Sequence, residues 1–202
     1  MKLYAAHISP YSRLVQMLIL EKGLGARVEI EFRPTRMPDN PLYAIQPSGR
    51  IPTFVTDDGD VYEDSALICA YLDHLDGAPA FERPPVGAAR WRYWQAEARA
   101  RSLVDGLSVW QREIYRPSGE SSQAVVAHET ARAMRFADAF EALIGDEVWL
   151  GDINVAQLLL IIGLQMQARL PAFAWQTGRP ALTAWAERMA RRESVSSTVP
   201  SD

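Results

Sequence analysis

The 202-residue sequence has little of the chemistry that disulfide-rich, metal-binding or membrane proteins need. One cysteine, Cys69, excludes an intrachain disulfide framework and a cysteine-rich metal site, and it fits a reducing compartment. Three scattered histidines suggest no metal. The longest apolar stretch, residues 155–164, falls far short of the roughly 20 residues that cross a bilayer, and no signal-peptide pattern follows Met1. The net charge of −4 gives no attraction for nucleic acid or anionic lipid. We expect a cytoplasmic protein that needs no metal and binds neither nucleic acid nor a membrane.

What the sequence does have is the composition of a globular protein, with 48% hydrophobic and 23% charged residues. Short strand and helix patterns alternate over the first 76 residues. They predict strands at residues 2–6 and 28–33, helices at 9–23 and 65–75, and a hairpin about Asp58-Gly59. A proline-rich loop or short helix separates the second strand from the hairpin. The order β-α-β-(loop or short helix)-β-β-α predicts an α/β domain with a mixed four-stranded sheet.

Residues 77–87 are rich in proline and glycine and show no periodicity, so we interpret them as a linker. Strand patterns stop after it. Helical patterns cover residues 88–115, 123–144, 154–170 and 180–192, and the third is almost apolar all round, as a central helix would be. We therefore predict an all-α second domain over residues 88–192. The serine-rich segment 193–202 is expected to be a disordered tail.

The segment Ser9-Pro10-Tyr11-Ser12 has the composition of a well-formed helix start, with serine at the N-cap and proline at the first helical position. Such a start directs free N–H groups and the positive end of the helix dipole at whatever lies beyond the strand. A thiol placed there has a lowered pKa. Ser9 could therefore donate a hydrogen bond to a bound thiolate, or it could merely cap its own helix. Ser12 is a second candidate donor, whereas we expect His7 to be a loop residue without chemistry.

Two further segments admit both a structural and a binding role. In Gly49-Arg50-Ile51-Pro52 the proline directly precedes a strand. A cis Ile51–Pro52 bond would leave the peptide groups of Ile51 free for an extended ligand, whereas a trans bond would simply begin an edge strand. At Asp64-Ser65 a carboxylate and a hydroxyl stand at a helix start. They could cap the helix, or they could hold an α-amino and an α-carboxylate group.

The combination of Ser-Pro-Tyr, Pro-x-Gly-Arg-Ile-Pro and Asp-Ser-x-x-Ile, in this order and spacing, resembles the glutathione-binding domain of glutathione transferases. The resemblance extends over the whole chain. It implies a thioredoxin-like domain at residues 1–76, a helical bundle at residues 88–192, and a homodimer formed across the helices at 65–75 and 88–115. It includes residues 150–157, which are similar to the family's N-capping box, with Asn154 as the cap and Gln157 reaching back to it.

The resemblance also implies roles in binding glutathione as a co-substrate. Ser9 takes the thiol-activating position of the serine-type classes. Ile51 pairs through its backbone with the cysteinyl part, next to a cis Pro52. Arg50 stands where lysine is usual and could pair with the glycyl carboxylate. The γ-glutamyl end would be held by Asp64, where glutamate is commoner, and by Ser65.

The function implied is that of a glutathione S-transferase with a detoxification role, which conjugates glutathione to small apolar electrophiles or uses it to reduce peroxides. Two alternatives remain open. One is a glutathione-dependent isomerase, dehalogenase or lyase, and the other is a catalytically silent glutathione-binding module. Tyr11 and the aromatic residues Trp91, Tyr93 and Trp94 are candidates for lining a second-substrate site, although core or interface packing is the favoured reading of the last three. Cys69 has the setting of a small core residue.

Overall fold

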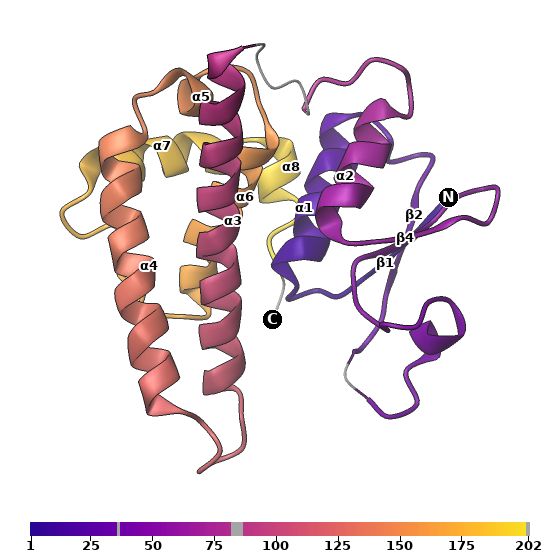
Figure 1. The fold of residues 1–202 in the computed structure, drawn as a ribbon, viewed down its shortest axis with the longest axis horizontal. Coiled ribbons are helices and arrows are strands. Elements are labelled where there is room, and N and C mark those ends of the chain that lie inside the picture. The colour runs from indigo at the N-terminus through magenta and orange to yellow at the C-terminus, as the bar shows by residue number, and fades with distance from the viewer. Residues whose placement is uncertain (36, 82–86, 201–202) are drawn as a thin grey trace. The chain divides into compact units, whose positions relative to one another are not determined.

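The computed structural model describes residues 1–35, 37–81 and 87–200, which form two compact units (Figure 1). The first unit holds Met1–Glu82 together with Glu193–Asp202, and the second holds Arg83–Arg192. The first is built on a mixed four-stranded sheet and the second is helical, so the fold class predicted from the sequence is confirmed. No helix in the described parts of the chain is both long and apolar enough to cross a membrane.

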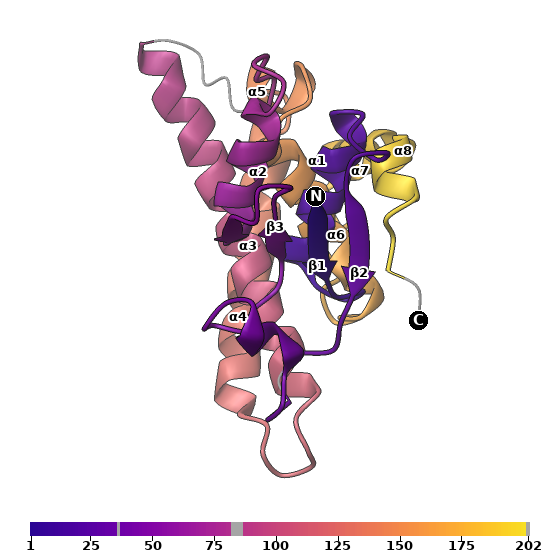
Figure 2. The same ribbon diagram turned by 90° about the vertical axis from the view of Figure 1, so that its right-hand side faces the viewer.

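The first unit follows the predicted order of strands and helices. Its elements are β1 (Lys2–Ala5), α1 (Pro10–Glu21), β2 (Glu29–Phe32), the 3-10 helix η1 (Pro41–Ala44), β3 (Thr53–Val55), β4 (Val61–Glu63) and α2 (Ser65–His74). The strand order is β2-β1-β3-β4, and Figure 2 shows β1 between β3 and β2. The β1–β2 pair is parallel because α1 crosses between them, and the other two pairs are antiparallel.

Two helices cover the sheet of the first unit and supply most of its core. α1 and α2 lie side by side (Figure 1). Their inward residues, among them Leu14, Leu18, Ile68 and Leu72, are fully buried, as is Phe54 of β3. Each such side chain contributes about 1.5–3 kcal/mol of apolar burial. This packing fixes where the first turns of both helices stand relative to the sheet.

The strand register brings three segments that are far apart in the sequence to one end of the sheet. Tyr4 near the end of β1 pairs with Thr53 at the start of β3, and Thr53 pairs with Glu63 at the end of β4. The chain leaves β1 toward α1, enters β3 from Pro52, and leaves β4 toward α2. The starts of both helices and the Ile51–Pro52 segment therefore meet at this end.

The second unit packs helices around one apolar helix. Its elements are α3 (Ala88–Ile114), α4 (Gln123–Leu143), α5 (Glu147–Leu150), α6 (Val155–Gln165), the 3-10 helix η2 (Met166–Ala168) and α7 (Pro180–Ala190). All ten residues from Val155 to Leu164 are buried, as predicted for a central helix. α6 approaches α3 closely at Gly163, where a Cβ atom would lie 3.1 Å from Leu103 Cδ2.

The capping box predicted at the start of α6 is confirmed for Asn154 but not for the partner of Gln157. The Asn154 side chain accepts a hydrogen bond from the Gln157 N–H at 3.0 Å, so Asn154 is the cap. The Gln157 side chain does reach back, but its Nε2 donates to the carbonyl oxygens of Val148 (2.9 Å) and Asp152 (3.2 Å). A glutamine amide can donate where a carboxylate cannot, and the unpaired carbonyls of the preceding turn take up those donors.

The expectation of a disordered tail at residues 193–202 is wrong for the part that the structure describes. Residues 193–196 form a short helix, α8 (Glu193–Ser196), which returns to the first unit and lies beside α1 (Figure 1). Val195 is 0% exposed and Ser194 is also buried. The mostly polar composition of this segment gave no indication that Val195 would be buried where α8 packs beside α1.

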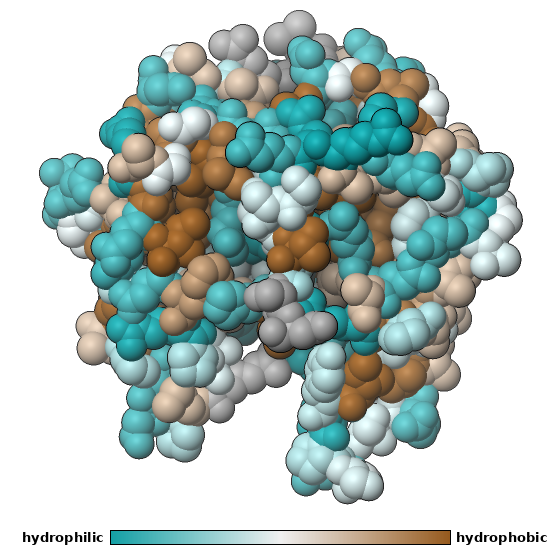
Figure 3. Space-filling view, turned by 180° about the vertical axis from the view of Figure 1, so that it is seen from behind, coloured by the Kyte–Doolittle hydropathy of each residue, from teal (hydrophilic) through white to brown (hydrophobic). Residues whose placement is uncertain are grey.

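The surface mixes hydrophilic and hydrophobic side chains, as the face in Figure 3 shows for both units. Some large apolar side chains are well exposed, among them Ile8, Leu67, Trp91 and Trp94.

Candidate functional site

The start of α1 presents the Ser9 hydroxyl at the end of the sheet where the three segments meet. Ser9 Oγ accepts a hydrogen bond from the Ser12 N–H at 3.2 Å, which is the N-cap interaction that the sequence predicts. A serine hydroxyl can accept and donate at once. Among the described residues Ser9 Oγ donates to no protein group, and the side chain is partly exposed. Capping and donation to a ligand are therefore compatible in this residue.

Ser12, the other candidate donor, points into the protein. Its side chain is 0% exposed, and its Oγ accepts a hydrogen bond from the Ala6 N–H at 3.4 Å. This bond ties the loop after β1 back to α1. His7 in the same loop stacks on Phe32, with ring centroids 3.8 Å apart and an interplanar angle of 11°. Both residues brace the loop that leads into Ser9.

The peptide of Ile51 lies at the same end of the sheet. Among the described residues neither its N–H nor its C=O has a hydrogen-bond partner. The peptide bond from Ile51 to Pro52 is cis. The carbonyl of the preceding residue, Arg50, accepts bonds from Gln46 Nε2 at 3.1 Å and Thr53 Oγ1 at 2.6 Å. The Ile51 peptide therefore follows a residue whose own carbonyl is held by two hydrogen bonds.

Asn40, which is not part of the sequence motifs described above, holds the loop that leads into Ile51. Its Nδ2 donates to the Gly49 carbonyl at 2.9 Å, and its Oδ1 accepts from the Leu42 N–H at 3.0 Å, capping η1. Gly49 needs its small size: its φ is +59°, and a Cβ there would lie 2.4 Å from Tyr43 Cε1. The pair Asn40-Pro41, an N-cap followed by proline, is the sequence signal that could have identified this clamp.

The start of α2 presents Asp64 and Ser65. Asp64 has a φ of +77° and a ψ of +123°, a conformation that costs a residue with a Cβ about 1–3 kcal/mol. One carboxylate oxygen, Oδ1, caps α2 by accepting from the Ala66 N–H at 2.8 Å. Asp64 is exposed, and within the described residues its Oδ2 receives no donor. Ser65, the first residue of the helix, is buried.

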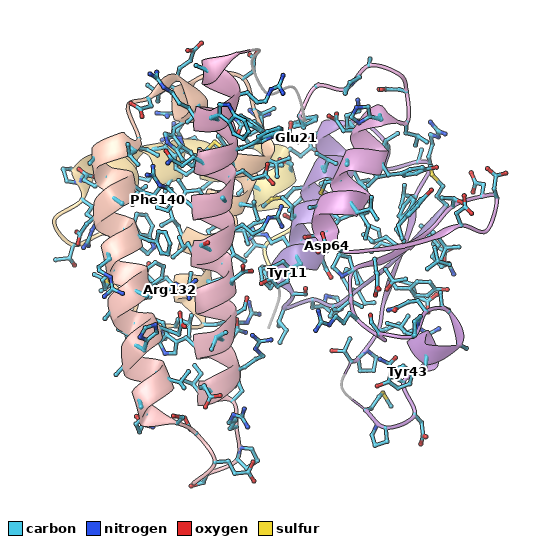
Figure 4. All side chains as sticks on the ribbon, viewed as in Figure 1. Tyr11, Glu21, Tyr43, Asp64, Arg132 and Phe140 are labelled. Atoms are coloured by element: carbon cyan, nitrogen blue, oxygen red, sulfur yellow. The ribbon has the colours of Figure 1, made fainter. Side chains whose placement is uncertain are left out.

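Figure 4 shows Tyr11 and Asp64 at neighbouring starts of α1 and α2. The structure therefore gathers Ser9, Ile51 and the Asp64-Ser65 pair at one end of the sheet, with the exposed Arg50 beside them. Two helix N-termini favour negative charge there, the Asp64 carboxylate favours a cation, and the Ile51 peptide can pair with an extended backbone. No group of three or more potential metal ligands occurs in the described part of the chain.

The aromatic candidates on α3 divide into two kinds. Tyr93 is buried, as a core residue would be. Trp91 and Trp94 are exposed and contact each other edge to face, with ring centroids 5.2 Å apart. Cys69 is buried in α2, as the sequence predicts for a core residue.

Comparison with known proteins identifies the family. Residues 3–80 match the family model described as the N-terminal domain of glutathione S-transferase. The chain is 30% identical to the uncharacterized GST-like protein YibF of Escherichia coli (strain K12), over 99% of this chain and 98% of the relative. It is 27% identical to glutathione S-transferase 3 of Zea mays, over 98% of this chain and 93% of that protein. The chain belongs to the glutathione transferase family.

Solved structures of relatives share the fold across both units. A glutathione transferase family member from Pseudomonas fluorescens Pf-5, solved with bound glutathione, is 28% identical and superposes with a TM-score of 0.90. The alignment covers 100% of this chain and 99% of that one. A second structure from Pseudomonas fluorescens Pf-5, with bound S-(propanoic acid)-glutathione, gives a TM-score of 0.86 at 27% identity and covers all of both chains.

Proposed function

We propose that this protein is a glutathione S-transferase that binds glutathione at the end of the sheet and activates its thiol. The activated thiol would be conjugated to, or would reduce, a small apolar electrophile or peroxide. The observation that carries the proposal is the Ser9 hydroxyl at the start of α1, which has no acceptor among the described residues and lies at the same end of the sheet as the Ile51 peptide, which has no partner among them.

Each part of glutathione has a complementary group in the site. The cysteinyl N–H and C=O pair with the free C=O and N–H of Ile51. The γ-glutamyl carboxylate lies at the N-terminus of α2 against the Ser65 hydroxyl and the helix amides, and its ammonium group pairs with Asp64. Arg50 is exposed beside this segment and pairs with the glycyl carboxylate.

The chemistry assigned to Ser9 is stabilisation of the thiolate. Its O–H donates to the sulfur while its Oγ continues to accept from Ser12, and the N-terminus of α1 favours the negative charge. Both effects lower the pKa of the bound thiol, so more of it is ionised near neutral pH. The thiolate attacks the electrophile, a bond to sulfur forms, and the leaving group departs with its electron pair. Ser9 keeps its proton throughout.

We also infer that the protein is a cytoplasmic homodimer with a detoxification role. The family resemblance implies a dimer interface across α2 and α3. Both helices carry exposed apolar residues, which are Leu67 on α2 and Trp91 and Trp94 on α3. Burial of such side chains is typical of an interface core. The single buried thiol of Cys69 suits a reducing compartment.

Calorimetric titration of glutathione, together with turnover assays on aromatic halides and peroxides, tests the proposal. We expect one glutathione bound per chain and turnover of at least one substrate class. Binding without turnover of any electrophile or peroxide would favour the silent glutathione-binding module. Absence of glutathione binding would contradict the proposed function altogether.

A further inference from the structure

The C-terminal segment that returns to the first unit holds α1 along its length. We call residues 193–198 the clasp. The Arg13 guanidinium donates to the Val195 carbonyl at 3.0 Å through Nη2 and to Thr198 Oγ1 at 3.3 Å through Nε. The Ser194 hydroxyl donates to the Glu21 carboxylate in the last turn of α1. Tyr11 and Glu21 lie at opposite ends of α1 in Figure 4, so the clasp binds both ends of the helix.

Arg13 connects the clasp to the thiol-binding end of α1. Its side chain is 3% exposed, and its backbone N–H donates to the Ser9 carbonyl at 3.0 Å, which closes the first turn of the helix. The same residue is therefore bonded to Ser9 through its backbone and to the clasp through its side chain. A buried guanidinium keeps its partners or moves toward water, because an uncompensated buried charge is costly.

We propose that Arg13 is a positioning residue that couples docking of the clasp to the thiolate site at Ser9. With the clasp docked, Arg13 is held and the first turn keeps its donors aimed at the sulfur of glutathione. With the clasp released, the guanidinium turns outward, and the turn that it closes loosens. The coupling acts in both directions, so bound glutathione favours the docked clasp by the same factor. This inference rests on the proposed binding of glutathione at Ser9.

Two adjacent clasp residues provide a matched pair of variants. The Thr198 hydroxyl donates to the Ser194 carbonyl at 2.6 Å and also accepts from Arg13. The Ser197 hydroxyl donates to the Glu193 carbonyl at 2.6 Å and makes no hydrogen bond to α1 among the described residues. Thr198→Val removes all three hydrogen bonds of its hydroxyl, which include a longer one to the Val195 carbonyl at 3.4 Å, whereas Ser197→Ala removes one intra-clasp bond alone. Arg13→Lys keeps the charge but loses the planar fork that reaches both acceptors.

The experiment measures glutathione affinity by calorimetry and the pKa of the bound thiol from thiolate absorbance against pH, in the wild type and the three variants. We expect Thr198→Val and Arg13→Lys to weaken glutathione binding about fivefold or more and to raise the thiol pKa. Ser197→Ala should behave as the wild type. Hydrogen exchange of the wild type should show slower exchange of the clasp amides when glutathione is added.

The outcomes separate this inference from the proposed function. A wild type that binds no glutathione contradicts the proposed function, and the inference falls with it. A wild type that binds glutathione while Thr198→Val and Arg13→Lys retain its affinity and thiol pKa overturns the inference alone, even if both variants melt at lower temperature. Clasp amides whose exchange does not respond to glutathione would overturn it as well.

Discussion

Replacing Asn40 by aspartate separates the two functions of this buried side chain. The wild-type amide caps η1 through Oδ1 and holds the Gly49 carbonyl through Nδ2. Aspartate keeps an acceptor for the Leu42 N–H but has no donor for Gly49 when it is ionised. Asn40→Asp therefore releases the loop that leads into Ile51 while preserving the cap.

The size of the effect follows from the burial of the site. Asn40 is 3% exposed and Gly49 is buried as well, so the carbonyl left without a donor has little access to water. A buried polar group that loses its partner costs about 1–3 kcal/mol. For a protein of this size each kcal/mol lowers the Tm by about 2–4 °C, so we expect a fall of about 2–12 °C. A protonated aspartic acid can donate to Gly49, so the loss should shrink at acidic pH.

The second unit offers a matched control for this substitution. Asn154 has a similar arrangement, with Oδ1 accepting from the Gln157 N–H and Nδ2 donating to the Val148 carbonyl at 2.9 Å, although that carbonyl also accepts from Gln157 Nε2. Thermal melts and glutathione calorimetry on both variants distinguish a local from a general effect. Asn40→Asp should lower stability and weaken glutathione binding, and Asn154→Asp should lower stability alone. Unchanged affinity in Asn40→Asp, or an equal loss in both variants, would refute the reasoning.

Three further substitutions test other parts of the account. Asp64→Asn keeps the cap of α2 but loses the charge for the ammonium group, so glutathione affinity measured by calorimetry should fall about tenfold with little change in Tm. Trp91→Glu places a charge in the inferred dimer interface and should move the chromatographic mass toward one chain of 22.6 kDa; an unaltered dimer would place the interface elsewhere. Lys22→Met removes the cation that contacts the buried Asp73 carboxylate at 3.4 Å, and it should cost about 3 kcal/mol in denaturant unfolding at neutral pH. The hydrogen bond from Lys22 lowers the pKa of Asp76, so the stability it adds is present above about pH 4 and is lost on further acidification. The difference in unfolding free energy between Lys22→Met and the wild type should therefore become smaller in acid. A difference that does not change with pH would contradict the stabilising role of the Lys22–Asp76 pair.

Local signals in the sequence predicted the elements that depend on local physics. Ser9 followed by Pro10 does begin α1, and Asp58-Gly59 does turn the hairpin, with Gly59 at a φ of +90°. The mostly apolar segment at residues 155–164, interrupted by Gln157, is the buried central helix. Each of these depends on residues that are close in the sequence, so a short window contains the whole cause.

The features that escaped prediction depend on contacts between distant residues. Arg13 and Val195 are 182 residues apart, and neither one alone indicates that the C-terminal segment is ordered. The burial of Ser12, which separates its role from that of Ser9, depends on how α1 packs on the rest of the unit. The positive φ of Asp64 is set by the passage from β4 into α2, and an aspartate in the sequence does not reveal it.

The thiol pKa of bound glutathione tests the central claim most directly, measured in the wild type, in Ser9→Ala and in Ser122→Ala. Ser122 caps α4 in the second unit through a hydrogen bond from the Val125 N–H, so its removal controls for the loss of a helix cap. The account predicts that all three proteins bind glutathione and that the wild type and Ser122→Ala lower the thiol pKa, whereas Ser9→Ala does not. An equally low thiol pKa in Ser9→Ala would contradict the role of Ser9 in activating the thiol.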